Sequence, residues 1–192
     1  MIDYTKRFDR ALRTSAWAHE QAGQHRKGTD VPYIVHPFAV MMTASQATKN
    51  EDVLIACLLH DVLEDVPSEI YDEARMTAEF GERVVAIVRD VTKDDDELDW
   101  HRRSQKYLDH LREQASDEAI IVSLSDKTHN LQSILFDYET VGDELWQRFS
   151  TKNKADQIWW YGSILEVVTE RQAPQVLVSQ FEDLMVKLHD LS

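Results

Sequence analysis

The chain contains only five glycines and four prolines in 192 residues, and this scarcity limits its secondary structure more than any other feature. Sheet-rich domains need many tight turns between short strands, and Gly and Pro supply most of them. Long segments of this chain instead repeat apolar residues at the three- and four-residue spacing of an amphipathic helix. We therefore predict a nearly all-α fold, a compact bundle of about 8–10 helices.

Turn-forming and helix-ending residues divide the chain into segments of helical length. Pro37 suits the first turn of a helix, Pro67 ends another, and Gly81 stops a third, for which Ser68 is a candidate N-cap. The predicted helices span residues 4–24, 37–47, 51–65, 69–80, 82–92, 100–114, 117–135, 143–151, 154–171 and 174–191. No internal repeat or flexible linker interrupts them, so we expect a single domain over residues 1–192.

Charge and composition argue against several classes of protein. With 21 Lys and Arg against 35 Asp and Glu, the formal net charge is −14, which disfavours non-specific binding to nucleic acid or to an anionic membrane. No apolar run is long enough to span a bilayer, and the charged N-terminus does not resemble a signal peptide. The single cysteine, Cys57, can form no internal disulfide, so we expect a cytoplasmic location. The sequence carries no signal for an oligomeric state.

The segment "LLHDVLED" places four ionisable side chains in one of the most apolar stretches of the chain. On a continuous helix, His60 would lie beside Glu64, and Asp61 beside Asp65, because positions four residues apart share a face. Burying unpaired carboxylates is costly unless something compensates their charge, and a divalent cation could do so. The alternative is a solvated helix end in which His60 is a hydrogen-bonded core histidine.

Two further ionisable residues stand beside apolar runs. His36 precedes Pro37 in "PYIVHPF", and Asp126 follows the run in "AIIVSLSDKTHNL". Taken singly, His36 is typical of an N-cap or surface histidine, and Asp126 of a surface acid. Together with His60 and Asp61 they form a set of two imidazoles and two carboxylates. With water completing an octahedral sphere, this set favours Mn²⁺, Fe²⁺ or Mg²⁺ over a closed zinc site.

Three motifs in this order resemble a known family. "AHEQAGQHRKGTDVPYIVHPFAV", "ACLLHDVLEDV" and "SLSDKTHNL" are similar to the HD-domain alarmone hydrolases, which comprise the hydrolase half of the Rel/SpoT enzymes and their small stand-alone relatives. The resemblance covers about residues 15–135, and the C-terminal helices, about 143–191, fit only loosely. It implies an all-α HD-domain fold, one Mn²⁺, and removal of the 3′-pyrophosphate from a purine nucleotide, ppGpp, pppGpp, ppApp or pppApp.

The resemblance also implies a role for individual residues. The implied metal ligands are His36, His60, Asp61 and Asp126. The residues implied to orient and activate the attacking water are Glu64 and Asp65. The residues implied to contact the nucleotide are Arg26, Lys27 and Asn130. An Arg-Lys pair suits a nucleotide polyanion, although the same basic residues could also cap the C-terminal end of the first helix.

The third motif departs from the family pattern, which commonly reads "KLADRLHN". Ser123 and Ser125 replace the usual lysine and alanine, and Thr128 replaces an apolar residue. This keeps two other functions open. One is a different HD-type phosphohydrolase that acts on a nucleoside monophosphate, a cyclic nucleotide or NADPH. The other is a non-enzymatic helical binding module that retains a metal. If the chain is an alarmone enzyme, we expect hydrolase activity alone.

Overall fold

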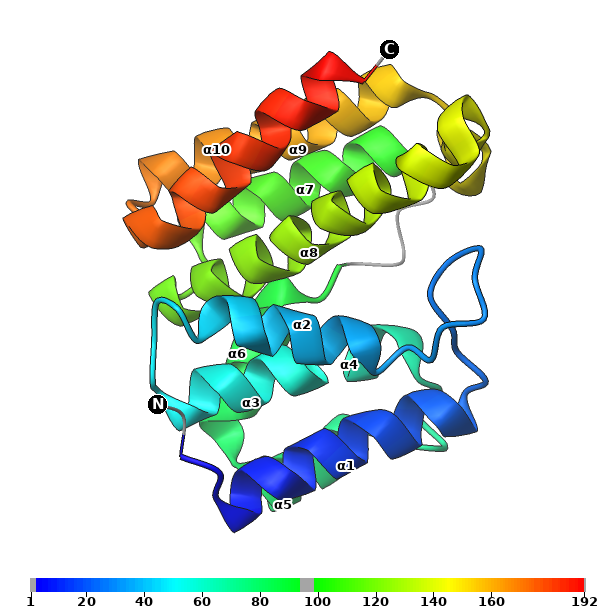
Figure 1. The fold of residues 1–192 in the computed structure, drawn as a ribbon. Helices are drawn as coiled ribbons and strands as arrows, with labels where there is room; N and C mark the ends of the chain where they lie inside the picture. The colour runs from blue at the N-terminus through cyan, green and yellow to red at the C-terminus, as the bar shows by residue number, and fades with distance from the viewer. Residues whose placement is uncertain (1–2, 94–98, 192) are drawn as a thin grey trace.

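The computed structural model describes residues 3–93 and 99–191, and over these residues it contains α-helices, one 3₁₀ helix and no β-strand (Figure 1). The elements are α1 (Lys6–Gln21), α2 (Val35–Ala44), α3 (Glu51–Leu59), α4 (Val62–Asp65), α5 (Glu73–Phe80), α6 (Glu82–Val91), α7 (Trp100–Glu113), α8 (Asp117–Val141), η1 (Gly142–Arg148), α9 (Lys154–Glu170) and α10 (Gln175–Asp190). The predicted all-α fold is confirmed. None of the described helices combines the length and apolar composition that crossing a bilayer requires.

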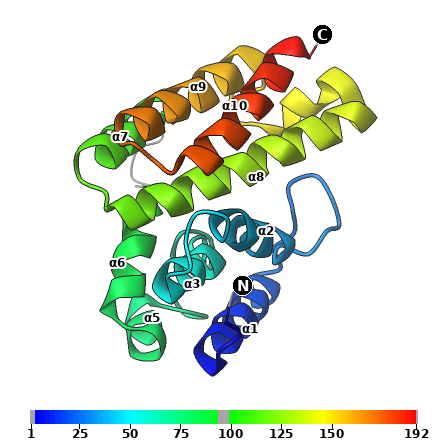
Figure 2. The ribbon, with the colours of Figure 1, turned by 60° about the vertical axis from the view of Figure 1, so that its left-hand side comes forward.

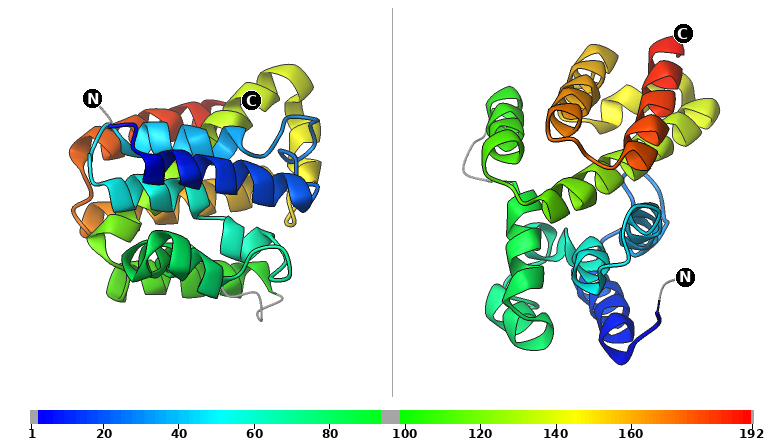
Figure 3. Two further views of the ribbon diagram at one scale, coloured as in Figure 1. Left: turned by 90° about the horizontal axis from the view of Figure 1, so that it is seen from below. Right: turned by 90° about the vertical axis from the view of Figure 1, so that its left-hand side faces the viewer.

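The longest helix, α8, runs through the middle of the molecule. It packs against α2, α3 and α6 on one side and against α9, α10 and η1 on the other. The views in Figures 2 and 3 show α1, α2 and α3 on one side of α8 and α7, α9 and α10 on the opposite side. Residues of α8 therefore face both halves of the bundle.

Helix α3 is buried on all sides. All of its residues from 53 to 59 are at most 2% exposed, because α1, α2, α6 and α8 surround it. A helix enclosed in this way needs apolar residues around its whole circumference, which explains the uninterrupted run "VLIACLL". The polar residues that follow this run, His60 and Asp61, are therefore attached to a helix that is buried and shielded from water.

The predicted helix over residues 51–65 is broken at His60 and Asp61, which is a correction to the sequence-based expectation. The Nδ1–H of His60 donates to the carbonyl of Cys57 at 2.9 Å. In a continuous helix that carbonyl would accept from the amide of Asp61. The chain turns at these two residues and resumes as α4. The expected stacking of His60 on Glu64 in one helix is therefore wrong.

Two other helix predictions differ from the structure. The helix stopped by Gly81 begins at Glu73, and its N-cap is Asp72, whose carboxylate accepts from the amide of Arg75, instead of Ser68. The segment expected as a helix over residues 143–151 is the 3₁₀ helix η1. Both differences concern short segments where local capping bonds decide the start or type of the helix.

The loop between α1 and α2, residues 22–34, folds back on itself. His25 and Pro32 form an isolated antiparallel bridge at its base. Gly28 has a positive φ of 75°, and a Cβ added there would come within 2.7 Å of the Arg148 side chain. The positive φ favours glycine at this position, and the close approach of the flexible Arg148 side chain adds to that preference. The loop at Gly28 therefore lies against Arg148, the last residue of η1.

Candidate metal centre

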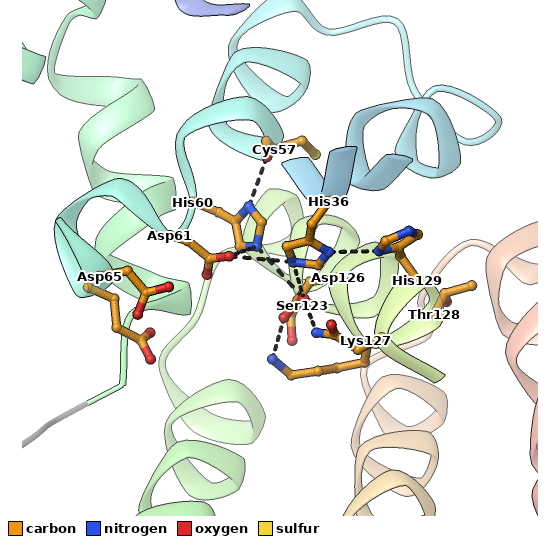
Figure 4. Close-up of polar contacts among 12 residues, drawn as sticks. His36, Cys57, His60, Asp61, Asp65, Ser123, Asp126, Lys127, Thr128 and His129 are labelled. Carbon is orange, nitrogen blue, oxygen red and sulfur yellow. Dashed lines mark hydrogen bonds and ion pairs between the residues drawn. The ribbon is translucent and has the colours of Figure 1, made fainter. Parts of the chain in front are cut away.

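Helices α2, α3 and α8 bring two imidazoles and a carboxylate together inside the protein. His36 lies in the first turn of α2, His60 caps the C-terminal end of α3, and Asp126 lies in α8. All three are buried, and one ligand atom from each lies within 4.8 Å of the other two. These helices pack against one another, so the packing of helices fixes the side chains (Figure 4).

Asp61 adds a second carboxylate to this group. Its Oδ2 lies 3.1 Å from Nε2 of His60 and 3.4 Å from Nε2 of His36. Asp126 Oδ1 approaches the same two nitrogens, at 3.1 Å from His36 and 3.8 Å from His60. The four predicted ligands therefore converge, and we call His36, His60, Asp61 and Asp126 the His–Asp cluster.

The atoms of the cluster fit a divalent cation. Nε2 of His60 is buried and has no partner with hydrogen-bond geometry in the described part of the chain. An unsatisfied buried polar atom costs about 1–3 kcal/mol, so an acceptor of its lone pair is expected. Two imidazole nitrogens and two carboxylate oxygens are a set of donors that suits a divalent transition metal. The residues present thus fit a metal ion.

The electrostatics of the cluster favour positive charge at its centre. Burial opposes protonation of His60, yet the carboxylates of Asp61 and Asp126 raise the pKa of His60 well above its ordinary value. Burial likewise opposes ionisation of both acids. His60 nevertheless holds the pKa of Asp61 well below the usual range, and Lys127 does the same for Asp126. A proton or a cation between these groups is therefore stabilised.

Each cluster residue has an outer hydrogen-bond partner. His36 Nδ1 lies 2.7 Å from Nδ1 of His129. Asp126 accepts a hydrogen bond from the ammonium of Lys127 through Oδ2. It accepts another from the side-chain amide Nδ2 of Asn130 through Oδ1, at 2.5 Å. Partners of this kind orient metal ligands and fix their protonation. The cluster is therefore held in one arrangement from outside.

Asp65 and Glu64, the predicted water-activating carboxylates, lie next to the cluster on α4. The hydroxyl of Tyr33 donates to Oδ2 of both Asp61 and Asp65, at 2.6 and 3.2 Å. Burial, followed by the charges of Asp61 and Glu64, raises the pKa of Asp65 to about 7. Glu64 accepts from the backbone amide of Lys93, and burial raises its pKa too. The carboxylates of Asp61 and Asp65, which the sequence predicts to lie side by side, share the hydroxyl of Tyr33.

A cavity of about 670 Å³ adjoins the cluster. The described residues that line it include five cationic side chains and one carboxylate, namely Arg26, Lys27, Lys93, Lys127, Arg148 and Asp137. Where it approaches the cluster, its wall consists of the cluster's own hydrogen-bond partners, Tyr33, Lys127, His129 and Asn130. Lys127 is paired with Asp126 and Arg148 with Asp137, which leaves Arg26, Lys27 and Lys93 as positive charges that could attract an anion.

Two lysines of the cavity wall lie near the same two aromatic rings. The ammonium of Lys127 lies 5.3 Å from the ring centroid of Tyr107 and 5.8 Å from that of Trp160. The ammonium of Lys93 lies 5.6 and 5.1 Å from the same rings. Cation–π contacts hold both charges near the cluster, although burial and the neighbouring Lys127 lower the pKa of Lys93. An anion between the lysines would relieve their repulsion.

The three residues predicted to contact a nucleotide all line the cavity. Arg26 donates to the side-chain oxygen of Asn130 at 2.9 Å, which links it to Asp126. Lys27 lies over the ring of Phe149 at 5.6 Å. Helix α1 ends at Gln21, so the alternative in which these basic residues cap that helix is wrong.

The altered positions of the third motif do not line the cavity. Ser123 is fully buried and hydrogen-bonded to the hydroxyl of Tyr107 at 2.9 Å. Thr128 donates to the carbonyl of Leu124 within α8, and Ser125 is fully buried. Ser123 therefore helps to orient Tyr107, whose ring contacts both lysines of the cavity wall.

The comparison with protein families agrees with this geometry. A family model described as the HD domain matches residues 11–156, which is most of the chain. The chain belongs to the HD-domain family. This HD domain is similar in sequence to guanosine-3′,5′-bis(diphosphate) 3′-pyrophosphohydrolases. One of them, MESH1 of Drosophila melanogaster, is 32% identical over 131 residues, which cover 67% of this chain and 69% of MESH1.

Bacterial relatives match over a smaller part of their length. The bifunctional (p)ppGpp synthase/hydrolase SpoT of Escherichia coli K12 is 31% identical over 137 residues, which cover 69% of this chain but 18% of SpoT. The Haemophilus influenzae guanosine-3′,5′-bis(diphosphate) 3′-pyrophosphohydrolase is 34% identical over 122 residues, 61% of this chain and 17% of that protein. This chain thus spans less than a fifth of these relatives.

Solved structures show the same fold. A metazoan orthologue of SpoT that hydrolyses ppGpp superimposes over the full length of both chains with a TM-score of 0.80 at 23% identity. The protein lmo0812 of Listeria monocytogenes matches with a TM-score of 0.69 at 24% identity, over 83% of this chain and 99% of its own. At these identities the likeness concerns the fold.

Sequence reasoning missed three residues of this HD domain that contact the site, namely Tyr33, Lys93 and His129. Two of them carried a signal. His129 follows Asp126 by three positions on one helix, and Tyr33 precedes His36 by three, so each shares a face or turn with a ligand. Lys93 carried none, since its position depends on how the end of α6 packs.

Proposed function

We propose that this HD domain is a Mn²⁺-dependent hydrolase that removes the 3′-pyrophosphate of a guanosine or adenosine alarmone, namely ppGpp, pppGpp, ppApp or pppApp. The observation that carries the proposal is the His–Asp cluster, whose buried His60 Nε2 has no hydrogen-bond partner among the described residues, at the edge of a cationic cavity in an otherwise acidic chain. The similarity to 3′-pyrophosphohydrolases supports the choice of substrate.

The cavity suits a highly phosphorylated purine nucleotide. A volume of about 670 Å³ falls within the range of small-molecule sites. Lys93 and Lys127 offer two ammonium groups to phosphate oxygens beside the cluster. Arg26 and Lys27 offer positive charge from the 22–34 loop, and the guanidinium can also stack on a base. Aromatic side chains, including Trp160, line the same space and could contact the purine.

In the proposed enzyme, His36, His60, Asp61 and Asp126 hold the metal ion. The ion, when bound, supplies Lewis acidity that acidifies water and offsets negative charge at the reacting phosphorus. Two imidazoles and two carboxylates would suit a divalent ion, and we propose Mn²⁺, with Fe²⁺ or Mg²⁺ as substitutes. The outer partners of the cluster keep the ligand atoms in position during turnover.

Asp65 and Glu64 handle the water and its proton in this proposal. Water attacks the phosphorus next to the 3′ oxygen, the bond from that phosphorus to the 3′ oxygen breaks, and the 3′ oxygen takes a proton. Asp65 shares the Tyr33 hydroxyl with Asp61 of the cluster and is the proposed proton acceptor. Glu64 has one oxygen fixed by the Lys93 amide, so it is better placed to orient the water.

A substrate panel with identified products tests this proposal. Metal-free protein is incubated with each alarmone, with nucleoside monophosphates, cyclic nucleotides and NADPH, in Mn²⁺, in Mg²⁺ and in chelator. We expect pyrophosphate from at least one alarmone, fastest with Mn²⁺ and absent in chelator. Orthophosphate from a monophosphate or from NADPH would instead identify another HD-type phosphohydrolase. Bound metal without any product would identify a non-enzymatic binding module.

A further inference from the structure

The contact between His36 and His129 joins two imidazoles nitrogen to nitrogen. Their Nδ1 atoms lie 2.7 Å apart, and the ring centroids are 5.0 Å apart with an interplanar angle of 34°. At this separation one nitrogen must carry the hydrogen and the other must offer a lone pair. The direction of this bond decides which nitrogen of His36 is free (Figure 4).

We propose that His129 is a positioning residue that accepts the Nδ1–H of His36 and thereby keeps the Nε2 lone pair of His36 directed into the His–Asp cluster. A metal ion held by the cluster requires this direction. Nε2 of His36 faces Asp126 Oδ1 at 3.1 Å and Asp61 Oδ2 at 3.4 Å, which is where a shared cation would lie. If His129 donated instead, a neutral His36 would carry its proton on Nε2 and could not bind a metal there.

The two cluster histidines are oriented by different kinds of partner. His60 donates from Nδ1 to the backbone carbonyl of Cys57, and a carbonyl can only accept, so the free nitrogen of His60 is fixed. His129 can donate or accept, so it fixes His36 only while its own Nδ1 is unprotonated. The state of one ligand therefore depends on a side chain that a single substitution can change.

His129 lies at the boundary between the cluster and the cavity. Its ring is partly buried on α8, where its Nδ1 contacts Nδ1 of His36. His129 also lines the cavity, so it lies between the proposed nucleotide and the cluster. The inference rests on the metal site of the proposed function and requires no particular nucleotide.

Nuclear magnetic resonance on the intact protein, loaded with diamagnetic Zn²⁺, tests the direction of the bond without any substitution in the reporting sample. Histidine labelled with ¹⁵N gives the protonated nitrogen of each ring, and variants of His36 and His129 assign the two signals. We expect a proton on Nδ1 of His36, none on Nδ1 of His129, and a coupling across the hydrogen bond between the two nitrogens. A proton on Nδ1 of His129 that bonds to His36 would overturn the proposal.

Metal affinity tests the positioning role. Asn offers its Oδ1 close to the place of a histidine Nδ1, whereas Phe keeps the ring and offers no acceptor. Titrating metal-free protein with Mn²⁺ alone, we expect His129→Phe to weaken binding about 10–100-fold and His129→Asn to stay within about threefold of the unsubstituted chain. Equal affinity of His129→Phe and the unsubstituted chain, or equal weakening of both variants, would overturn the proposal.

Two controls separate this inference from its neighbours. Thermal unfolding of the metal-free variants detects a general loss of folding, which a metal-positioning role does not predict for His129→Asn. An unsubstituted chain that binds Mn²⁺ but cleaves no alarmone would refute the proposed function and leave the role of His129 standing. A chain that binds neither Mn²⁺ nor Zn²⁺ would refute both.

Discussion

The His–Asp cluster and the cavity beside it are built in different ways. His36, His60 and Asp126 are at most 6% exposed, lie on three mutually packed helices, and are each held by a hydrogen bond to an outer partner. The cationic cavity wall adds residues of the 22–34 loop, η1 and the end of α6 to Lys127 of α8, and cation–π contacts hold three of its charges near aromatic rings. The cluster is enclosed by packed helices, whereas the cavity wall includes the exposed side chain of Lys27.

This difference indicates a division of tasks. The chemistry requires a fixed set of ligands, because small displacements of a ligand cost affinity and rate. Nucleotide recognition can use charges that adjust to the phosphates. We therefore expect substitutions in the cluster to abolish metal binding and turnover together, and substitutions of cavity residues that make no hydrogen bond to the cluster to weaken substrate binding alone.

Removing a cluster carboxylate should have the largest effect. We expect Asp126→Asn to lower kcat/KM about 10³-fold or more, because the loss of an anionic ligand removes several kcal/mol of charge stabilisation. Mn²⁺ affinity, measured by titration, should fall as well. Glu139→Gln removes the same charge from an exposed position of α8 and should change neither quantity. If the Asp126→Asn protein were active and bound metal, Asp126 would not be a metal ligand.

Replacing the proposed proton acceptor should separate chemistry from metal binding. We expect Asp65→Asn to lower kcat about 10²–10⁴-fold, the usual contribution of a general base, with Mn²⁺ affinity within about threefold. Glu64→Gln should cost less, because one oxygen of Glu64 is already bonded to the Lys93 amide. Steady-state rates with saturating Mn²⁺ measure both. Unchanged rates in both variants would show that neither carboxylate takes part in the reaction.

A cavity-wall substitution should affect binding alone. Lys27 is exposed and lies over Phe149, away from the cluster. We expect Lys27→Met to raise the KM for an alarmone about tenfold through loss of a charge-assisted contact, with kcat and Mn²⁺ affinity nearly unchanged. Lys49→Met, an exposed lysine outside the cavity, is the matched control. A fall in Mn²⁺ affinity in Lys27→Met would contradict the division of tasks.

The pH dependence of stability gives the smallest expected effect. Burial and the charges of Asp61 and Glu64 raise the pKa of Asp65 to about 7 in the folded, metal-free protein, above its value of about 4 when unfolded. The folded state therefore binds the extra proton, so this contribution is full below about pH 4 and is lost as pH rises through about 7.

Urea unfolding in chelator at about pH 5 and about pH 8 measures this contribution. Because part of Asp65 remains accessible to solvent, which screens the neighbouring charges, we expect a loss of only about 1 kcal/mol between the two pH values. Asp65→Asn should remove that part of the pH dependence. The same pH profile in both proteins would show that Asp65 does not titrate in this range.

Sequence reasoning succeeded where the signal is local. Helical periodicity predicted the all-α fold, and the apolar run before His60 predicted a buried helix, because both depend on neighbours within a few residues. The break at His60 escaped prediction, because it depends on a side chain that takes the carbonyl of Cys57. Sequence patterns do not show which carbonyls a side chain will reach.

The candidate site was predictable in part for the same reason. The four ligand candidates each stand beside an apolar run, and the structure brings them together. Their outer partners depend on contacts between distant segments. His129 meets His36 across 93 positions, and the carboxylate of Glu64 reaches the amide of Lys93 across 29. Such contacts arise from how helices pack, which composition and spacing do not specify.

In the proposed reaction, water attacks the phosphorus next to the 3′ oxygen, and the His–Asp cluster is required for this attack. Hydrolysis of ppGpp in water enriched in ¹⁸O, with Mn²⁺ and with mass analysis of the products, tests it most directly. We predict one ¹⁸O atom in the released pyrophosphate, none in the nucleotide product, and no reaction for Asp126→Asn. Unlabelled pyrophosphate, or label found in orthophosphate, would contradict this account.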